Sequence, residues 1–490
     1  MSRLARIFTQ GDTARLLVRW FGLISAGCIL GAILTEFYPL AGLPFGLLLA
    51  YLLVVDYRQV FFLLFLVIPF STEVELPGGL GTDLPDEPLI LLLFGVYGLY
   101  VLRHGGALDL RFVRHPLSLL LLAHVAWIAF TALTSANVLV SIKFLLAKLW
   151  YVTVFYFLAA RLLVDQAQVR KLLWYTLPAV TVTVLWVLVR HFPSGFDFEV
   201  ADEVVRPFYR NHVNYASMLA LLMPPLVWLW SRYRRFSFRW WTLLLCGAVL
   251  LTGVWFSYTR AAYVCLLGAG AAYFVVRWRL LRYGMVIAVI AACVGVLYLA
   301  QNNTYLDYAP DYERTVSIKQ WDNLLEATAK GEDISTMERV YRWVAGSQMI
   351  PERPVTGFGP GNFYNFYRGY TVSSFETYVS FNPEKSGIHS YYLMTLVEQG
   401  WPGFLLFTAF VFATLLYGEQ IYRRCTDPDE RALVMALILC LVIIDALLLI
   451  NDMVETDKVG PFFFLSAALL VNADLRQRRR APAIERALGR

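Results

Sequence analysis

One histidine stands where a long polar segment ends and an apolar run begins. His389 lies in the stretch Gly387–Tyr392, at the end of the polar residues of about 301–388. Histidine has an unperturbed pKa of about 6.5, which suits the removal of a proton near neutral pH. An interfacial histidine hydrogen-bonded to a helix end would occupy the same position. The position alone therefore leaves a catalytic base and a structural residue equally open.

Four arginines are expected on the same side of the chain as His389. Arg210 precedes an apolar run, Arg260 lies in a short turn, and Arg339 and Arg342 are spaced to share one helix face. A guanidinium near hydrocarbon costs at least about 2.5–3.5 kcal/mol at mid-membrane unless it is paired. A pyrophosphate fits its planar fork. Helix carbonyls or lipid phosphates are the alternative partners for any one of them.

A glycine-rich turn follows these arginines in the polar segment. The segment Pro354–Phe363 reads PVTGFGPGNF. Pro360 and the absence of a preceding strand exclude a dinucleotide-binding loop. The aromatic residues that follow would either anchor the segment at the headgroup level or stack on sugar rings, and anchoring is favoured.

No metal site is expected from the sequence. The six histidines are scattered without ligand spacing, and Asp427 and Asp429 form an Asp-x-Asp pair in an arginine-rich turn. Asp445 within an apolar run is a candidate functional acid, although pairing with a neighbouring helix would explain it equally well.

The rest of the sequence indicates that these residues are held by membrane-spanning helices. The 490 residues are 58% hydrophobic and only 16% charged, against roughly 25% charged in soluble domains. Runs of apolar residues predict an all-α polytopic membrane protein with about 12–14 transmembrane helices. The runs at about 42–55 and 59–70 could instead form one re-entrant hairpin. The first run, about 16–35, is expected to remain as a spanning helix because no small-x-small cleavage site follows it.

Charge predicts the orientation of these helices. Most of the 42 Lys and Arg residues fall in alternate loops, together with both ends of the chain. This pattern places both termini in the cytoplasm and the residues around His389 on the outer face. The net charge of +6 therefore reflects the basic loops that set the orientation of the helices in the membrane. Nucleic-acid binding is not expected.

Two outer segments are long, at about 191–213 and 301–388. The second is expected to contain short helices, one of them over Ile334–Met349, where Ser335 or Thr336 with Glu338 gives a capping signal.

In order and spacing, the motifs from Arg210 to Gly403 resemble those of the O-antigen ligase and O-antigen polymerase superfamily of bacterial membrane glycosyltransferases. The resemblance includes Ser257–Arg260, Arg210–Asn214 and four further motifs, which are Arg339-x-x-x-Trp343, Pro354–Phe363, His389–Leu393 and Glu398–Gly403. Many ligases have His-Asn where this chain has His389-Ser390, so the subfamily stays open between ligase, repeat-unit polymerase and protein-directed transfer.

The resemblance implies a GT-C-like fold in the inner membrane, with its active face in the periplasm and one long periplasmic loop, 301–388. The N-terminal helices would be residues 1–209, the ligase-like core 210–403, and the last helices with a basic cytoplasmic tail 404–490. The enzyme would move a glycan from undecaprenyl pyrophosphate to lipid A-core or a growing glycan, without metal or another cofactor.

The resemblance also implies roles for particular residues. His389 would be the base, and the pyrophosphate would be bound by Arg210, Arg260, Arg339 and Arg342. Acceptor or sugar contacts are expected from His212, Asn214 and Tyr391. A lipid-linked glycan transporter is the main alternative, but no internal repeat supports it. A helical receptor or scaffold would leave the arginines unexplained.

Overall fold

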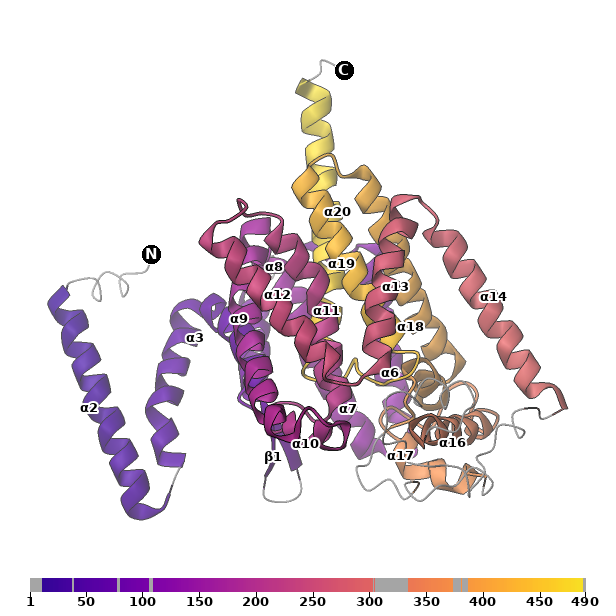
Figure 1. Cartoon of the computed structure of the whole chain (residues 1–490), viewed down its shortest axis with the longest axis horizontal. Coiled ribbons are helices and arrows are strands. Elements are labelled where there is room, and N and C mark those ends of the chain that lie inside the picture. Colours follow the sequence, from indigo (N-terminus) through magenta and orange to yellow (C-terminus); the bar gives the residue numbers. More distant parts are fainter. Residues whose placement is uncertain are drawn as a thin grey trace. The chain divides into compact units, whose positions relative to one another are not determined.

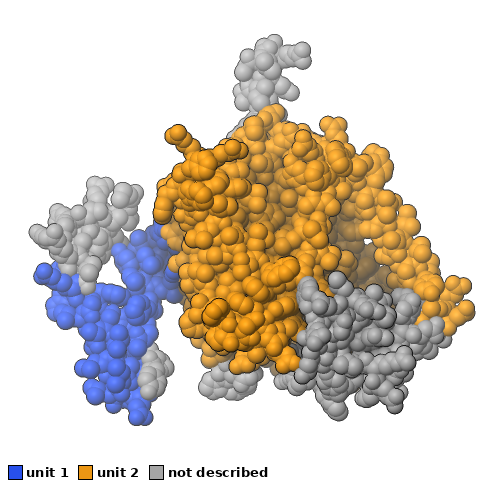
Figure 2. Space-filling model, viewed as in Figure 1, with its two compact units in different colours: residues 1–64 blue, residues 65–490 orange. Residues whose placement is uncertain are grey.

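The computed structural model describes residues 11–37, 39–76, 80–104, 109–302, 304, 334–372, 380 and 387–487. Parts of the predicted long loop, residues 303, 305–333, 373–379 and 381–386, lie outside the described residues. The contacts divide the chain into two units, residues 1–64 and 65–490 (Figure 2). All the predicted site residues belong to the second unit.

The first unit consists of apolar helices. Helix α2 covers Gly11–Thr35, and α3 begins at Pro39 and ends at Val67, just beyond the unit boundary. Its backbone leaves the helical conformation at Asp56. The predicted runs 42–55 and 59–70 therefore form two helical segments bent by 120° against each other, which fits either a broken span or the re-entrant hairpin considered from the sequence.

The second unit is a bundle of long helices (Figure 1). In chain order, they are α4 (Asp86–Arg103), α6 (Pro116–Leu133), α7 (Val138–Tyr151), α9 (Gln166–His191), α11 (His212–Trp230), α12 (Phe238–Trp255), α13 (Arg260–Arg277), α14 (Leu281–Ala300), α16 (Ile334–Met349), α18 (Tyr391–Arg424), α19 (Pro428–Leu447) and α20 (Gly460–Ala487). A π-helical stretch, η2 (Val152–Leu158), continues α7 into α8 (Ala159–Leu162). The helix predicted over Ile334–Met349 is confirmed as α16.

Shorter elements connect these helices. They are η1 (Ile68–Phe70), β1 (Thr72–Leu76), β2 (Leu80–Leu84), α5 (Leu110–Val113), η3 (Phe192–Ser194), η4 (Phe198–Val200), α10 (Ala201–Val204), α17 (Phe363–Phe366) and η6 (Tyr367–Tyr370). The two strands form an antiparallel hairpin in which Thr72 pairs with Leu84 and Leu76 with Leu80.

The length and composition of the helices confirm an all-α polytopic membrane protein. Within the described residues, eight helices are long and apolar enough to cross a membrane, and the broken helix α3 would make nine. Helices α4, α19 and α20 have at least 18 residues each but carry more charged or polar side chains. The 12–14 spans predicted from the sequence require that such helices cross as well.

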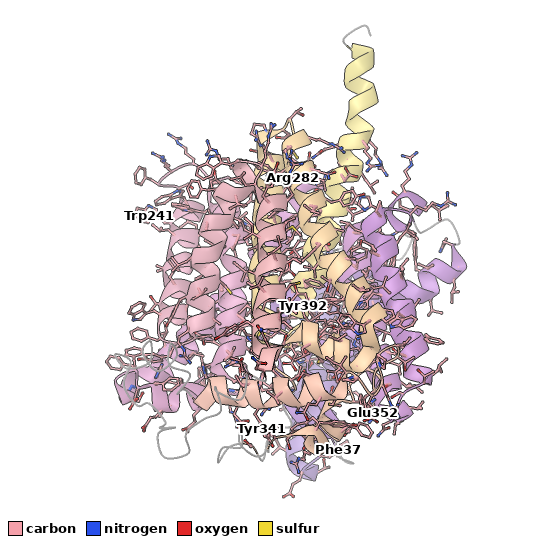
Figure 3. The ribbon with its side chains drawn as sticks, turned by 90° about the vertical axis from the view of Figure 1, so that its right-hand side faces the viewer. Phe37, Trp241, Arg282, Tyr341, Glu352 and Tyr392 are labelled. Carbon is pink, nitrogen blue, oxygen red and sulfur yellow. The ribbon has the colours of Figure 1, made fainter. Side chains whose placement is uncertain are left out.

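The two ends of the bundle differ in character. Helices α16 and α17 lie at one end, called here the loop end, and α20 projects from the other, called the tail end (Figure 1). Arg282 and Trp241 lie at the tail end, whereas Tyr341 and Glu352 lie at the loop end (Figure 3). Because successive helices of the second unit alternate in direction, the described cationic loops of this unit, which the sequence assigned to one side, meet at the tail end.

Helix α19 lies at the centre of this bundle. It packs against α11, α13, α18 and α20, and Ile438, Ile443 and Ile444 on it are completely buried. Helix α18 packs along α6 as well. In a lipid environment such contacts are stabilised by close packing and interhelical hydrogen bonds rather than by exclusion of water. The packing fixes the helix ends from which the site is built.

Candidate active site

His389 lies at the loop end, directly before α18. Its φ of 58° is in the left-handed region, which a residue with a side chain rarely adopts. The next residue, Ser390, caps α18, because its hydroxyl accepts a hydrogen bond from the backbone N–H of Leu393 at 3.5 Å. Asparagine is an equally good helix cap. Either residue at position 390 could therefore cap α18 directly after the histidine.

Two arginines of α16 lie beside this turn. Arg342 is 4% exposed, and its Nη1 donates to the carbonyl oxygen of Gly387 at 3.0 Å. Its Nη2 pairs with Glu338 at 3.2 Å, one helical turn earlier. Arg339 donates from Nε to the carbonyl oxygen of Ile450 at 3.3 Å and is the more exposed of the two arginines. The structure thus brings both predicted α16 arginines to the histidine.

The surroundings of His389 change the pKa of its imidazole. Burial, with the charges of Arg342 and Arg339, lowers the pKa of His389 to about 3. The ring is therefore neutral near pH 7 and has a lone pair with which to accept a proton. A bound anion would offset the guanidinium charges and make the ring more basic.

The loop between α19 and α20, residues 448–459, connects the elements around this turn. The backbone N–H of Tyr391 donates to the carbonyl oxygens of Leu448, at 2.9 Å, and Asn451, at 3.2 Å. Lys458 is 2% exposed and donates to the carbonyl oxygens of Ile68 and Ser71, at 2.6 and 3.0 Å. The 448–459 loop therefore ties the starts of α18 and β1 together.

A carboxylate from the 448–459 loop lies against the histidine turn. A side chain at position 387 would overlap the carboxylate of Asp452 unless that carboxylate moved, so the glycine lets the two segments approach closely. Burial raises the pKa of Asp452, while the charges of Arg342 and Arg210 act in the opposite direction. Asp452 thus lies within electrostatic reach of predicted arginines from two different elements.

Arg210 is the most exposed of the predicted arginines. It lies just before α11 and pairs with Glu73 of β1, with its Nη2 3.0 Å from Oε2. Its side chain is 63% exposed, so the pair contributes little to stability and leaves the guanidinium accessible. The charge of Arg210 acts electrostatically on Asp452. Among the described residues, Arg210 makes no contact with His389.

Arg260 and the start of α11 form a second part of the loop end. Arg260 is the first residue of α13, after a turn in which Tyr258 has a φ of 54°. The hydroxyl of Thr259 donates to the carbonyl oxygen of His212 at 3.2 Å, which joins this turn to α11. No measured contact within the described residues links Arg260 to His389.

His212 and Asn214 are both engaged in local structure. The ring of His212 lies 2.6 Å from Asp202, and the backbone N–H of Asn214 donates to the cap residue Asn211 at 2.9 Å. Asn214 is 9% exposed. Their predicted contacts with sugar or acceptor stay predictions.

Tyr391 belongs to a buried polar cluster with Lys148 and Glu455. Its hydroxyl is 2.6 Å from Glu455 and receives a hydrogen bond from Lys148 at 3.1 Å. Lys148 also forms an ion pair with Glu455. Tyr391 is completely buried, so its observed partners are these two charged groups, and its predicted sugar contact stays a prediction.

The glycine-rich turn packs against a break in α18. Gly400 has a φ of 68° within α18 and lies so close to the backbone of Val355 that a Cβ would overlap it. The carboxylate of Glu398, which is 2% exposed, accepts hydrogen bonds from the N–H groups of Gly361 and Phe363 at 2.7 and 2.9 Å. The motifs Pro354–Phe363 and Glu398–Gly403 therefore pack against each other and are linked by hydrogen bonds.

The aromatic residues after this turn are largely structural. Phe363 and Tyr367 are buried and stack with ring centroids 5.0 Å apart. Phe358 packs against Phe366 and Tyr370, and its ring centroid lies 5.7 and 5.9 Å from theirs. These contacts hold the described part of the long segment together and favour anchoring over sugar stacking for Phe363 and Tyr367.

Sequence reasoning missed Lys148, Asp452 and Glu455. The signal for Lys148 was a lysine within an apolar run, since charged residues inside spans are usually functional or paired. The signal for the two acids was a short, strongly charged connection between two apolar runs. Asp445, which the sequence did single out, is 8% exposed within α19.

The site can bind an anion and accept a proton in one place. Two guanidinium groups flank a neutral imidazole, and a third acts on the adjoining carboxylate. Within the described residues, no three or more His, Cys, Asp or Glu side chains are grouped so that they could hold a metal ion.

Comparison with known proteins is consistent with this geometry. Residues 249–408 match a family model described as O-antigen ligase. The match includes Arg260, Arg339, Arg342 and His389, whereas Arg210, His212 and Asn214 precede it. A search of curated proteins found no match.

Proposed function

The family match places the chain in the O-antigen ligase and polymerase superfamily, and from this premise we propose that it is an O-antigen ligase. It transfers a glycan from undecaprenyl pyrophosphate to an acceptor hydroxyl, with lipid A-core as the expected acceptor. The observation that carries the proposal is the pair Arg339 and Arg342 beside a neutral His389 at one end of a membrane bundle.

The reaction proposed is a single displacement. His389 takes the proton from the acceptor hydroxyl while its oxygen bonds to the anomeric carbon. The bond from that carbon to the phosphate oxygen breaks, and undecaprenyl pyrophosphate leaves with the electron pair. One face of the sugar is attacked while the other loses its leaving group, so the anomeric configuration inverts.

The arginines stabilise the charge that develops on the leaving group. Arg339 is the more accessible and would contact the pyrophosphate, whereas the buried Arg342 would act mainly through its charge and by holding the histidine turn. Electrostatic contacts of this kind are worth about 3–4 kcal/mol in comparable sites. Arg210 and Arg260 would bind the diphosphate from the side of α11 and α13. No metal ion takes part in this proposal.

Orientation follows from the positive-inside rule. Because the cationic loops gather at the tail end, that end and both termini would face the cytoplasm, and the loop end would face the periplasm. The membrane would be the bacterial inner membrane, where lipid-linked glycans are available as donors.

The test is a transfer assay with the purified full-length protein. It would use an undecaprenyl-pyrophosphate glycan as donor, EDTA throughout, and either lipid A-core or a lipid-linked repeat unit as acceptor. Transfer to lipid A-core that is lost in His389→Ala supports a ligase. Elongation of the repeat unit alone would identify a polymerase of the same superfamily. Robust transfer by His389→Ala would remove the assignment of the base.

A further inference from the structure

A cavity with three arginines lies at the tail end, on the opposite side of the bundle from His389. It has a volume of about 210 Å³. Its walls come from α4, α5, η2, α8 and α20, and its cationic residues are Arg161, Arg476 and Arg479. The proposed transfer reaction uses none of these residues.

The three guanidinium groups are fixed by different partners. Arg161 stacks over the ring of Tyr100 at 4.5 Å and donates to its hydroxyl at 2.6 Å. Arg476 donates from Nε to Glu430 and from Nη1 to the carbonyl oxygen of Val164, both at 2.7 Å. These contacts hold two of the groups in place before any ligand binds.

Among the described residues, the third guanidinium has one partner, and this partner is exposed. Nη2 of Arg479 is 2.9 Å from Asp109, and the two side chains are 55% and 46% exposed. Such a surface pair is worth at most about 1 kcal/mol. Nε and Nη1 of Arg479 have no partner among the described residues, so Arg479 can exchange its carboxylate for another anion.

The remainder of the cavity is mostly apolar. Tyr97, Phe112, Phe157 and Leu475 contribute to its wall. Cavities that bury a whole drug-sized ligand measure about 300–1,000 Å³. This smaller space accommodates a phosphate with a few adjoining carbon atoms, and its aromatic residues form an apolar wall for those carbon atoms.

We propose that this cavity binds the phosphate headgroup of an anionic phospholipid. Planar guanidinium groups match phosphate oxygens in charge and geometry, and basic pockets between spanning helices recognise such headgroups. Phosphatidylglycerol has the required chemistry, with one phosphate diester and an apolar chain beside it. The proposal does not depend on the transferase assignment, because the site lies at the other end of the helices.

The test measures lipid binding to the full-length protein in neutral detergent by native mass spectrometry. Phosphatidylglycerol, phosphatidylcholine with the same acyl chains, and inorganic phosphate are added separately. We expect phosphatidylglycerol to bind preferentially, with affinity about tenfold lower in Arg479→Gln. Asp109→Asn, which releases Arg479, should bind about two- to fivefold more tightly.

Two further variants separate the cavity from general surface charge. Val164→Trp introduces bulk from a side chain that is 53% exposed and should weaken binding without removing a charge. Arg282→Gln removes a charge at the tail end outside the cavity (Figure 3) and should leave affinity unchanged.

Equal binding of the two phospholipids would overturn the proposal. So would an equal loss of affinity in Arg479→Gln and Arg282→Gln. Inorganic phosphate that binds as tightly as phosphatidylglycerol would show a site for free anions and would overturn the assignment to a lipid.

Discussion

The guanidinium group of Arg342 donates a hydrogen bond of 3.0 Å to the carbonyl oxygen of Gly387, two residues before His389. The same group pairs with Glu338 through its other terminal nitrogen. Arg342 therefore fixes the backbone that presents the histidine, while burial, with the charges of Arg342 and Arg339, lowers the pKa of the imidazole and keeps it neutral. Arg342 thus contributes to both the position and the protonation state of the proposed base, together with burial and the charge of Arg339.

Replacement of Arg342 by lysine should separate its geometry from its charge. Lysine keeps the charge but cannot supply two terminal nitrogens to Gly387 and Glu338 at once. We expect the transfer rate of Arg342→Lys to fall about 10²–10³-fold. Arg353→Lys is the matched control, because Arg353 stacks over Phe358 and is not among the charges that lower the pKa of His389. Near-wild-type turnover in Arg342→Lys would assign Arg342 a purely electrostatic role.

The pKa of His389 should rise when the donor pyrophosphate binds. In the free protein, burial and two guanidinium charges lower it to about 3, so the ring stays neutral from pH 8 down to about pH 5. A bound diphosphate would neutralise those guanidinium charges. NMR of ring-labelled histidine, with His389→Gln to assign the signal, would follow the titration with and without a donor analogue. An unchanged pKa would place the diphosphate away from this histidine.

Protonation of His389 should also affect stability below neutral pH. Its pKa is about 3 in the folded protein and about 6.5 in the unfolded chain. Above about pH 6.5 the histidine is neutral in both states and does not affect the free energy of unfolding. As the pH drops from there toward 3, the unfolded chain binds the proton more readily than the folded protein, so stability falls. His389→Gln should lose less stability than the wild type over this window, as measured by thermal unfolding in detergent. Parallel curves for the two proteins would contradict the lowered pKa.

The sequence was sufficient for features that depend on local patterns. The helix over Ile334–Met349 could be predicted from a capping signal and helical spacing, and the position of His389 before α18 from a change in hydropathy. The alternation of basic loops identified which segments share one end of the bundle. These signals arise within a few residues of the features that they predict.

Features that depend on contacts between distant segments could not be predicted. Glu398 binds the N–H groups of Gly361 and Phe363, and Lys148 pairs with Glu455 more than three hundred residues away. Neither partner of such a pair carries a local signal for the other. The 448–459 loop looked like a short connection, and its role as the link between α18, α16 and β1 emerges only in three dimensions.

Glu398 should be important for stability rather than for chemistry. Its buried carboxylate accepts two backbone hydrogen bonds that join the glycine-rich turn to α18. Leaving a buried donor unsatisfied costs about 1–3 kcal/mol, so Glu398→Ala should lower the thermal unfolding temperature clearly and Glu398→Gln less. The control is Glu352→Gln, at an exposed position in the same region. Equal unfolding temperatures for Glu398→Ala and the control would contradict this role.

Lys148 and Glu455 should show strong energetic coupling. Lys148 is 2% exposed, and its ammonium group is satisfied by Glu455 and the hydroxyl of Tyr391. Removal of one partner from a fully buried ion pair typically costs about 3–5 kcal/mol, because the other charge is left uncompensated. Glu455 is 25% exposed, so Lys148→Met should be destabilising by less than this.

The double variant Lys148→Met/Glu455→Gln tests this coupling, because it leaves neither charge behind. It should regain much of the stability lost in Lys148→Met, and a double-mutant cycle of unfolding free energies would give the interaction energy directly. Additive losses would show that the two groups act independently. Since Tyr391 begins the helix that His389 precedes, the coupled pair should also influence the transfer rate by altering the start of α18.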